Sequence, residues 1–578
     1  MAGHFSTQPA VAANLSSLLS HMGLLDSDGA SGDDNEVSGA PIFTESVRKH
    51  AQAPGNQPFK QYALLGGDAA KLASSTMLTG SLLGAEHDPR IFYNVAAPAS
   101  VFVCGSQGSG KSHTLSCILE NCLIPSNASV LPRPLTGIVF HYDTFVSDTG
   151  GAPCEAAYLA SSKGVQVRVL CPPTNIVKLR KIYSVLPRVT VEELRLDESD
   201  LNTKRMLDLM AVSSLQGGGM PLYLHVVTRI LRDLRIVQQM SGGNFDYTTF
   251  RQTLELQDLT PGQMAPLQQR LDTLESFMPK QQVQFANLQV QNANLAKKKG
   301  PAQTLAQKPK GPAQTPPKKQ NGAAQRAGNI WTPKPGQLTI IDLSCPCITQ
   351  EAACALFNIC LSLFLEQDSK VGRIIALDEA HKYMTDTDEC ATLTETLLAT
   401  IRLQRHLGTR VVVSTQEPTI SPKLLDLCSI TIVHRFTSPD WFKSLRQHLA
   451  GANNLAQGTD TGAVMGRSSQ SEFEQELLAQ ILSLRTGEGL LFSPSALIGM
   501  GEVGHPGLRS GSEPAALIDL LGDSGGVKLD ELHSSPGGQG SATATPARMR
   551  PINLGSRPLK IRVRKRITAD GGRTIMAG

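Results

Sequence analysis

Residues 105–112 constrain the fold of this chain more than any other segment. They read Gly-Ser-Gln-Gly-Ser-Gly-Lys-Ser and match G-x-x-x-x-G-K-[ST] at every fixed position. A β-rich run, 101–104, precedes them, and apolar residues at helical spacing follow at Leu115, Ile118, Leu119 and Cys122. A strand, a glycine-rich turn and a helix in this order form a cradle of backbone N–H groups for phosphate. The sequence therefore predicts a P-loop that binds a nucleoside triphosphate, with ATP as the expected cofactor.

Each part of this loop has an expected role. The glycines let successive N–H groups turn toward the β-phosphate without a Cβ in the way. Lys111 would reach the β- and γ-phosphates and act in catalysis, and the Ser112 hydroxyl would ligate Mg²⁺. The expected nucleotide-binding residues are Gly105, Ser106, Gln107, Gly108, Ser109, Gly110, Lys111, Ser112 and His113.

A second motif supplies carboxylates. The run 374–381, Ile-Ile-Ala-Leu-Asp-Glu-Ala-His, has the form of a Walker B strand followed by its acidic pair. Asp378 would hold Mg²⁺ through water, and Glu379 would orient and deprotonate the attacking water. Carboxylates that follow a parallel strand lie at the carboxyl edge of the sheet, where the phosphate loop also opens. His381 fits a structural histidine better than a direct role.

Two further candidates stand near a third apolar strand, 410–414. Gln416, or Thr415 beside it, is placed to hydrogen-bond the γ-phosphate or the water. Arg405 lies on a predicted helix upstream and would neutralise charge in the transition state, in its own or in a neighbouring subunit. Arg435, after the strand 430–434, is a weaker arginine candidate, and a solvated helix face explains Arg405 equally well.

The pattern of apolar runs predicts an α/β fold with a mainly parallel sheet. Such runs stand at 101–104, 137–141, 167–171, 338–343, 373–377, 410–414, 430–434 and 489–492. Several are apolar throughout, as expected for strands that are covered on both faces. Residues 188–290 instead show mostly helical spacing, which predicts an α-helical insertion in the α/β core. The apolar run between Glu351 and Glu366 is too short to span a bilayer and predicts a buried helix.

Composition divides the chain into six segments. We expect a disordered N-terminal segment at 1–57, the first part of the core at 58–150, and a further strand with the helical insertion at 151–295. A basic, Pro/Gln/Lys-rich linker at 296–336 carries the repeat Lys-Gly-Pro-Ala-Gln-Thr and has little to bury. The second part of the core follows at 337–504, and a flexible tail with a basic end at 505–578.

Charge and cysteine content limit the function classes. The net charge is +4, so a globally basic nucleic-acid-binding protein is not indicated. The basic residues cluster in two arms, 297–334 and 548–573, which fit solvated tethers or a nuclear import signal better than DNA contacts. The 11 cysteines include no CxxC pair, and reduced thiols predict an intracellular protein, cytoplasmic or nuclear, without a membrane span.

The order of the motifs resembles the HerA–FtsK superfamily of P-loop ATPases, and more narrowly uncharacterised fungal proteins of this type. A phosphate loop, a large insertion, Leu-Asp-Glu-Ala-His at 377–381 and Val-Val-Val-Ser-Thr-Gln-Glu-Pro at 411–418 carry the resemblance. It covers about 95–145 and 337–500. It implies a RecA-like core, Mg²⁺-dependent ATP hydrolysis, a homo-oligomer of hexameric type, and action on double-stranded DNA.

Three departures weaken the DNA-motor part of this resemblance. The N-terminal barrel typical of HerA has no room in 58–95, Glu417 stands where relatives often have arginine, and the helical insertion is not part of the pump core. A DEAH-box helicase fits less well, because residues 417–578 leave no room for a second motor domain. The alternative function is an ATP-dependent switch or scaffold whose helical insertion binds protein partners.

Overall fold

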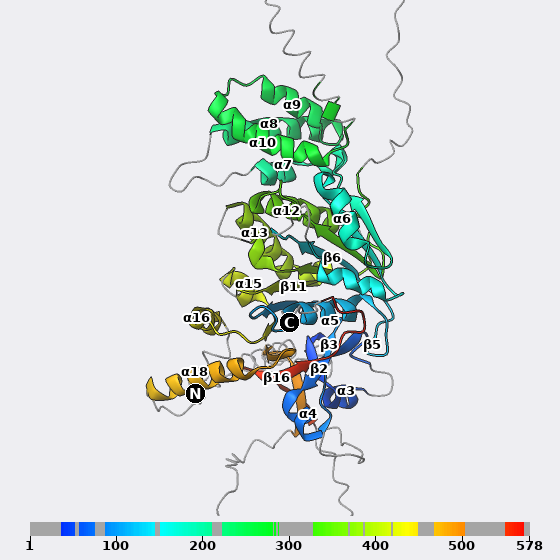
Figure 1. Cartoon of the computed structure of the whole chain (residues 1–578), viewed down its shortest axis with the longest axis vertical. Helices are drawn as coiled ribbons and strands as arrows, with labels where there is room; N and C mark the ends of the chain where they lie inside the picture. The colour runs from blue at the N-terminus through cyan, green and yellow to red at the C-terminus, as the bar shows by residue number, and fades with distance from the viewer. Residues whose placement is uncertain are drawn as a thin grey trace, which may run out of the picture.

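In this computed structural model, sixteen strands of the described residues form one continuous sheet. The structure describes residues 36–52, 57–75, 87–144, 151–210, 222–280, 283–284, 287, 328–367, 370–384, 388–417, 420–448, 467–502 and 549–571. The strands are stacked along the long axis of the molecule, with a helical unit at one end and an antiparallel extension at the other (Figure 1).

Eight parallel strands make the central block, and the phosphate loop follows its second strand, β4, which lies near the middle of the whole sheet. The order is β12–β4–β11–β10–β6–β9–β7–β8. Their bounds are β4 (Ser100–Cys104), β6 (Thr136–His141), β7 (Gln166–Cys171), β8 (Val189–Glu193), β9 (Gln337–Asp342), β10 (Arg373–Leu377), β11 (Thr409–Thr415) and β12 (Ile430–Val433). This mostly parallel sheet with the phosphate loop after β4 confirms the predicted RecA-like P-loop NTPase fold.

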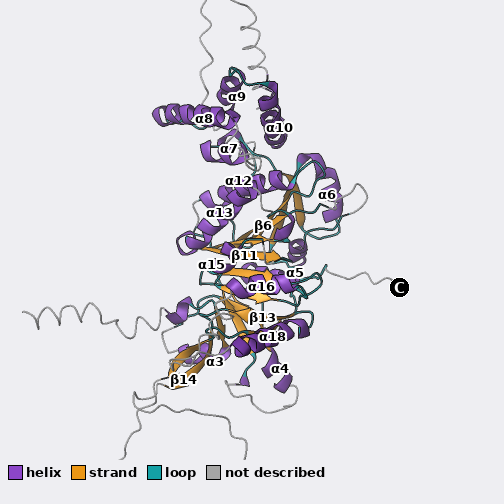
Figure 2. Cartoon of the chain, turned by 90° about the vertical axis from the view of Figure 1, so that its left-hand side faces the viewer, coloured by secondary structure: helices purple, strands orange, loops and turns teal. Residues whose placement is uncertain are grey.

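Helices cover both faces of this block, and Figure 2 shows the strands enclosed between them. Alternation along β4 explains why, because Val101 and Val103 point into one core and Phe102 and Cys104 into the other. The first core contains α5 (Lys111–Leu123), the 3₁₀ turn η2 (Glu155–Ser161) and α6 (Ile176–Tyr183). The second contains α12 (Gln350–Glu366), α13 (Asp388–Arg402) and α15 (Pro422–Leu427).

The predicted strands are found, but the prediction missed β8 in the parallel block and several strands outside it. All eight β-rich runs correspond to strands, seven in the parallel block and 489–492 in β13 (Glu488–Phe492). The strand β8 lies in the region predicted to be mostly helical, so that prediction is wrong for 189–193. Val189 and Val191 alternate with polar residues there, which suits an edge strand paired only with β7. The predicted buried helix is α12, and across the parts of the chain that the structure describes no helix is both long and apolar enough to cross a bilayer.

A mainly antiparallel extension, in which β1 and β14 pair in parallel, continues the sheet beyond β12 in the order β13–β16–β2–β3–β1–β14–β15. It contains β1 (Ile42–Thr44), β2 (Tyr62–Asp68), β3 (Arg90–Asn94), β14 (Leu497–Glu502), β15 (Met549–Asn553) and β16 (Leu559–Val563), with β5 (Ser129–Val130) pairing off β2. The helices beside it include α3 (Glu45–Ala51) and α4 (Ala69–Ser75).

Two predictions of disorder are therefore wrong in part. Within 1–57, residues 36–52 contribute β1 and α3, because Phe43 and Val47 are buried against Phe59 and Phe92. Within 505–578, residues 549–571 contribute β15 and β16, because Ile561 and Val563 are buried between β13 and β2. Composition did not indicate that these two segments are ordered, since polar residues surround their few apolar side chains. Residues 1–35, 53–56, 503–548 and 572–578 lie outside the described residues.

The helical insertion forms its own layer at one end of the molecule (Figure 1). It consists of α7 (Thr203–Met210), α8 (Leu222–Ser241), α9 (Tyr247–Glu255) and α10 (Pro261–Phe277). Residues 288–327, most of the predicted linker, lie outside the described residues. Residues 328–336 belong to the core instead, because Trp331 is buried and the side chain of Asn329 accepts a hydrogen bond from the N–H of Arg195.

The remaining helices lie along the edge of the second face. They are α14 (Gln404–Leu407), α16 (Pro439–His448) and α18 (Arg467–Ser483), and short 3₁₀ turns occur at Pro173–Asn175, Glu198–Asp200 and Ala380–Lys382.

Candidate nucleotide site

The loop after β4 has the backbone that its glycines permit. Gly105 has φ of 152° and Gly110, which precedes α5, has φ of 114°. A Cβ on Gly105 would lie 2.7 Å from the Cβ of His434, and one on Gly110 would lie 3.0 Å from the backbone N of Gly487. Neither position can hold a larger residue without rearrangement, so the loop is a closely packed turn at the start of α5.

Lys111 lies inside this loop. Its Nζ donates a hydrogen bond to the carbonyl of Ser106 at 3.2 Å, and the residue is only 4 % exposed. Burial lowers the pKa of Lys111, while the charges of Glu379 and Asp378 oppose that shift. The ammonium group and the two carboxylates therefore act on one another, although they are 267 and 268 positions apart in the sequence.

The sheet brings these groups together. β10 and β4 both pair with β11, and Leu377 and Phe102 both lie opposite Val413. The two strands are thus separated by two inter-strand spacings, about 10 Å, and their carboxyl ends lie at the same edge. Asp378 and Glu379 leave the sheet at this edge, where the phosphate loop also begins.

Glu379 has a strained backbone and polar neighbours. Its φ is 49° and its ψ is 47°, in the left-handed region that residues other than glycine seldom adopt. Gln416 donates a hydrogen bond from Nε2 to Glu379 Oε2 at 3.2 Å, and His381 Nδ1 lies 3.4 Å from the same oxygen. The structure therefore brings Gln416 and His381 to Glu379. Thr415 instead donates its hydroxyl to the carbonyl of Glu417.

Asp378 is buried and its two oxygens have different surroundings. Oδ2 lies 3.3 Å from His141 Nδ1 and accepts a hydrogen bond from Cys154 Sγ at 3.8 Å. Oδ1 is buried and makes no hydrogen bond to any described group. Burial lowers the pKa of His141, but the neighbouring Cys154 and Asp378 more than offset this, so that pKa is raised. No sequence pattern marks His141 or Cys154 as site residues, because each is a single polar residue beside an apolar run.

A cavity of about 550 Å³ opens beside the phosphate loop. Its lining combines phosphate-loop residues and Glu379 with Glu155, with Thr486 and Gly487, and with residues near the C-terminal end. The lining residues are Gln107, Gly108, Gly110, Lys111, Ser112, His113, Glu155, Glu379, Thr486, Gly487, Arg562, Val563, Arg564, Lys565 and Asp570. The basic C-terminal segment, expected to be a tether, thus forms part of the candidate site.

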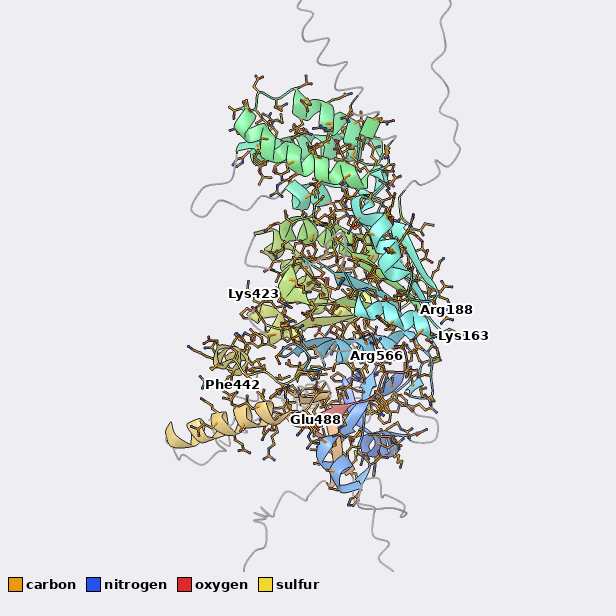
Figure 3. All side chains as sticks on the ribbon, viewed as in Figure 1. Lys163, Arg188, Lys423, Phe442, Glu488 and Arg566 are labelled. Atoms are coloured by element: carbon orange, nitrogen blue, oxygen red, sulfur yellow. The ribbon has the colours of Figure 1, made fainter. Side chains whose placement is uncertain are left out.

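We call residues 564–571 the C-terminal strap, because they continue from β16 across α5. Glu120 of α5 is fully buried and anchors the strap: it accepts hydrogen bonds from Arg564, from the N–H of Ile567, and from Thr568. Burial raises the pKa of Glu120, but these hydrogen bonds outweigh it and the pKa is lowered. Arg566 also pairs with Glu155, and Figure 3 shows Arg566 beside α5.

His434 connects the loop helix to its neighbours. Thr114 donates its hydroxyl to Nε2 at 2.9 Å, and Nδ1 donates to the carbonyl of Glu488 at 2.7 Å. The Glu488 carbonyl can only accept, so Nδ1 carries a proton, and in a neutral ring Nε2 is then the acceptor for Thr114. Burial lowers the pKa of His434 from 6.5 to about 4, which agrees with a neutral ring.

Of the two arginine candidates, the structure places Arg435 nearer to the phosphate loop than Arg405, although the sequence favoured Arg405. Arg405 lies on α14, just before β11 begins, and the seven residues of β11 separate it from Gln416. That length is about 23 Å, so the structure does not bring Arg405 to the site of its own chain. Arg435 follows β12 at the correct edge, and its carbonyl accepts hydrogen bonds from the N–H and hydroxyl of Ser106.

The residues present fit a nucleoside triphosphate with Mg²⁺. The glycine turn leaves no room for a Cβ, and the loop N–H groups stand at the start of a helix of 13 residues. The unpartnered Oδ1 of Asp378 and the Ser112 hydroxyl offer the hard oxygen donors that Mg²⁺ prefers.

The chain is similar to several solved structures at low sequence identity. No protein-family model and no curated protein matches the sequence. VirB4 of Thermoanaerobacter pseudethanolicus is 11% identical with a TM-score of 0.35, over 75% of this chain and 93% of that chain. The bacterial conjugative coupling protein TrwBΔN70 is 12% identical with a TM-score of 0.35, over 76% and 93%.

A third similar structure is the genome packaging NTPase B204 from Sulfolobus turreted icosahedral virus 2 in complex with ATP-gammaS. It is 13% identical with a TM-score of 0.19, over 28% of this chain and 63% of that chain. All these TM-scores are below 0.5, so the fold assignment rests on the strand order and on the phosphate loop. These features are those of a RecA-like P-loop NTPase.

Proposed function

We propose that this protein binds ATP and hydrolyses it with Mg²⁺. The observation that carries the proposal is the shared cavity: Lys111 and Glu379, far apart in the sequence, both line it. A cation for the phosphates and a carboxylate for the attacking water are the two groups that hydrolysis of a triphosphate needs beside the metal.

Each residue would then have a defined role. The N–H groups of 105–112 would hold the phosphates, and Lys111 would leave the Ser106 carbonyl for the β- and γ-phosphates. Mg²⁺, when bound, would neutralise phosphate charge, with Ser112 and Asp378 as its residues. Glu379 would take the proton of the attacking water, and Gln416 would hold the Glu379 carboxylate in position through its hydrogen bond.

The resemblance to HerA–FtsK ATPases extends the proposal to a ring that acts on double-stranded DNA. Arg405 supports an assembly, because it is exposed and distant from its own site, as expected for a residue that a neighbouring subunit would donate. The C-terminal strap argues against DNA binding by the basic end, since Arg564 and Arg566 already pair with Glu120 and Glu155. DNA contacts are therefore not proposed for these two arginines.

The test is ATP turnover by the purified chain, with and without Mg²⁺ and with and without double-stranded DNA. The proposal expects turnover that requires Mg²⁺, stimulation by DNA that falls steeply with salt, and a larger particle by mass photometry when ATP is present. A chain that never turns over ATP contradicts the ATPase, and one that turns it over as a lasting monomer contradicts the ring.

The exposed face of α8 favours a second candidate, the ATP-dependent switch. Ile236, Val237 and Met240 are 53 %, 57 % and 79 % exposed on this helix of the insertion. Exposed apolar residues that lie together often mark contacts with other proteins. Slow hydrolysis that DNA does not change, together with partner binding that depends on ATP, would support the switch over the motor.

A further inference from the structure

A buried cluster of three metal-ligating side chains lies behind Asp378. It consists of His141 at the end of β6, Cys154 just before η2, and Asp378 just after β10. One ligand atom of each lies within 4.8 Å of the others, and no cluster of this kind is found elsewhere in the described ranges. We propose that His141, Cys154 and Asp378 bind a thiophilic divalent cation, Zn²⁺ being the expected ion.

The distances suit such an ion. A tetrahedral site with bonds of about 2.0 Å to nitrogen and oxygen and about 2.3 Å to sulfur places its ligand atoms about 3.3 to 3.6 Å apart. Here Nδ1 of His141 lies 3.3 Å from Oδ2 of Asp378, and Sγ of Cys154 lies 3.8 Å from the same oxygen. Small shifts of these side chains would give all three bonds, and a water would take the fourth position.

The polar atoms of the cluster have little else to bind. His141 Nδ1 and Asp378 Oδ1 are buried without a hydrogen bond to any group that the structure describes. Asp378 is 3 % exposed and Cys154 is not exposed at all. Buried groups of this kind are costly unless they are paired or ligate a metal.

The donor set selects the ion. Imidazole, thiol and carboxylate together favour Zn²⁺, whereas Mg²⁺ prefers oxygen donors alone. The two metals would therefore use different oxygens of Asp378. Zn²⁺ would take Oδ2, which faces His141 and Cys154, and the water shell of the nucleotide's Mg²⁺ would take Oδ1. Because one carboxylate serves both, Zn²⁺ would slow ATP turnover; this consequence rests on the proposed function, but metal binding does not.

The probe is Co²⁺, which replaces Zn²⁺ in such sites and reports thiolate ligation by a charge-transfer band in the near ultraviolet. Full-length, reduced protein should bind one equivalent with this band, and Zn²⁺ should displace it. Cys154→Ala should lose the band and bind Co²⁺ at least ~10-fold more weakly. His141→Asn should weaken binding in the same way.

The matched control is Cys347→Ala. Cys347 is exposed and stands beside Cys345 in the closest cysteine pair of the sequence, so it is the main competing thiol site. This variant should keep both the band and the affinity. A wild-type protein without the band, or a band that Cys347→Ala removes and Cys154→Ala keeps, would overturn the proposal and leave the cluster as a hydrogen-bonded ion pair.

Turnover separates this inference from the proposed function. Zn²⁺ should lower the ATPase rate of the wild type several-fold more than that of Cys154→Ala, each compared with its own rate without zinc. Equal inhibition of both proteins would refute the shared use of Asp378. A bound metal in a protein without ATPase activity would refute the proposed function and leave the metal site standing.

Discussion

At the scale of single residues, His434 shows how burial fixes the state of a group that titrates near neutral pH. Its ring is fully buried and bridges Thr114 and the Glu488 carbonyl, and this burial favours the neutral form. The pKa is 6.5 in the unfolded chain and about 4 in the fold, a difference of about 3 kcal/mol between the protonation states. As the pH falls, His434 therefore takes up its proton in the unfolded chain at a higher pH than in the folded one.

This difference predicts how stability depends on pH. Because the folded pKa is lowered, the contribution of His434 is fully present above about pH 6.5 and is lost as the pH falls toward about 4. Thermal melts across this window should show a steeper loss of stability for the wild type than for His434→Gln, which does not titrate. His406→Gln, on the exposed side of α14, is the control and should keep the wild-type slope. Parallel slopes for wild type and His434→Gln would contradict the neutral ring.

At the scale of elements, the strands of the core other than β8 were predictable, and the strands of the extension other than β13 were not. The runs at 373–377 and 410–414 are apolar throughout, since helices cover both faces, and such runs are readable from one sequence. β16 reads Leu-Lys-Ile-Arg-Val, and its basic residues concealed the alternation of buried Ile561 and Val563. The cavity-lining residues within 107–113 and Glu379 could be predicted from motifs, whereas Arg562–Lys565 reach the site only through long-range contacts, such as that of Arg564 with His113, 451 positions apart.

The strap gives a prediction at this scale. Glu120→Gln removes the buried carboxylate that holds Arg564 and the Thr568 backbone, and should destabilise the fold by about 3–5 kcal/mol. It should also weaken binding of a fluorescent ATP analogue, because the strap forms a wall of the cavity. The control Glu395→Gln breaks an exposed pair with Lys423 and should cost at most about 1 kcal/mol. An unchanged affinity in a destabilised Glu120→Gln protein would make the strap a purely structural element.

The linker between the helical insertion and β9 gives a second prediction at this scale. Replacing 297–326 with a short Gly/Ser linker should leave ATP binding intact, because this low-complexity segment has little to bury. Extending the deletion to 336 removes buried Trp331 and should destabilise the fold by about 3–5 kcal/mol. The two deletions are compared by thermal melting and by nucleotide titration. Lost binding in the shorter deletion would show that residues before 327 belong to the site.

At the scale of the whole molecule, strands from the N-terminal and C-terminal parts of the chain pair within the same sheet. Residues 559–563 pair with β2 from near the start and with β13, so a strand from the N-terminal part supports the C-terminal segment that lines the site. The helical insertion lies at the far end of the same sheet (Figure 1). The chain is thus a P-loop core with one addition at each end of its sheet, and the nucleotide site lies between them.

The central claim is that residues 105–112 and 378–379 act on one bound triphosphate. Its most direct test is to measure binding and hydrolysis of ATP separately in Lys111→Ala and Glu379→Gln. We expect Lys111→Ala to lose nucleotide binding, since it removes the buried cation of the loop. Glu379→Gln should bind ATP as the wild type does and hydrolyse it at least ~100-fold more slowly. Normal turnover by Glu379→Gln, or normal ATP binding by Lys111→Ala, would contradict the account.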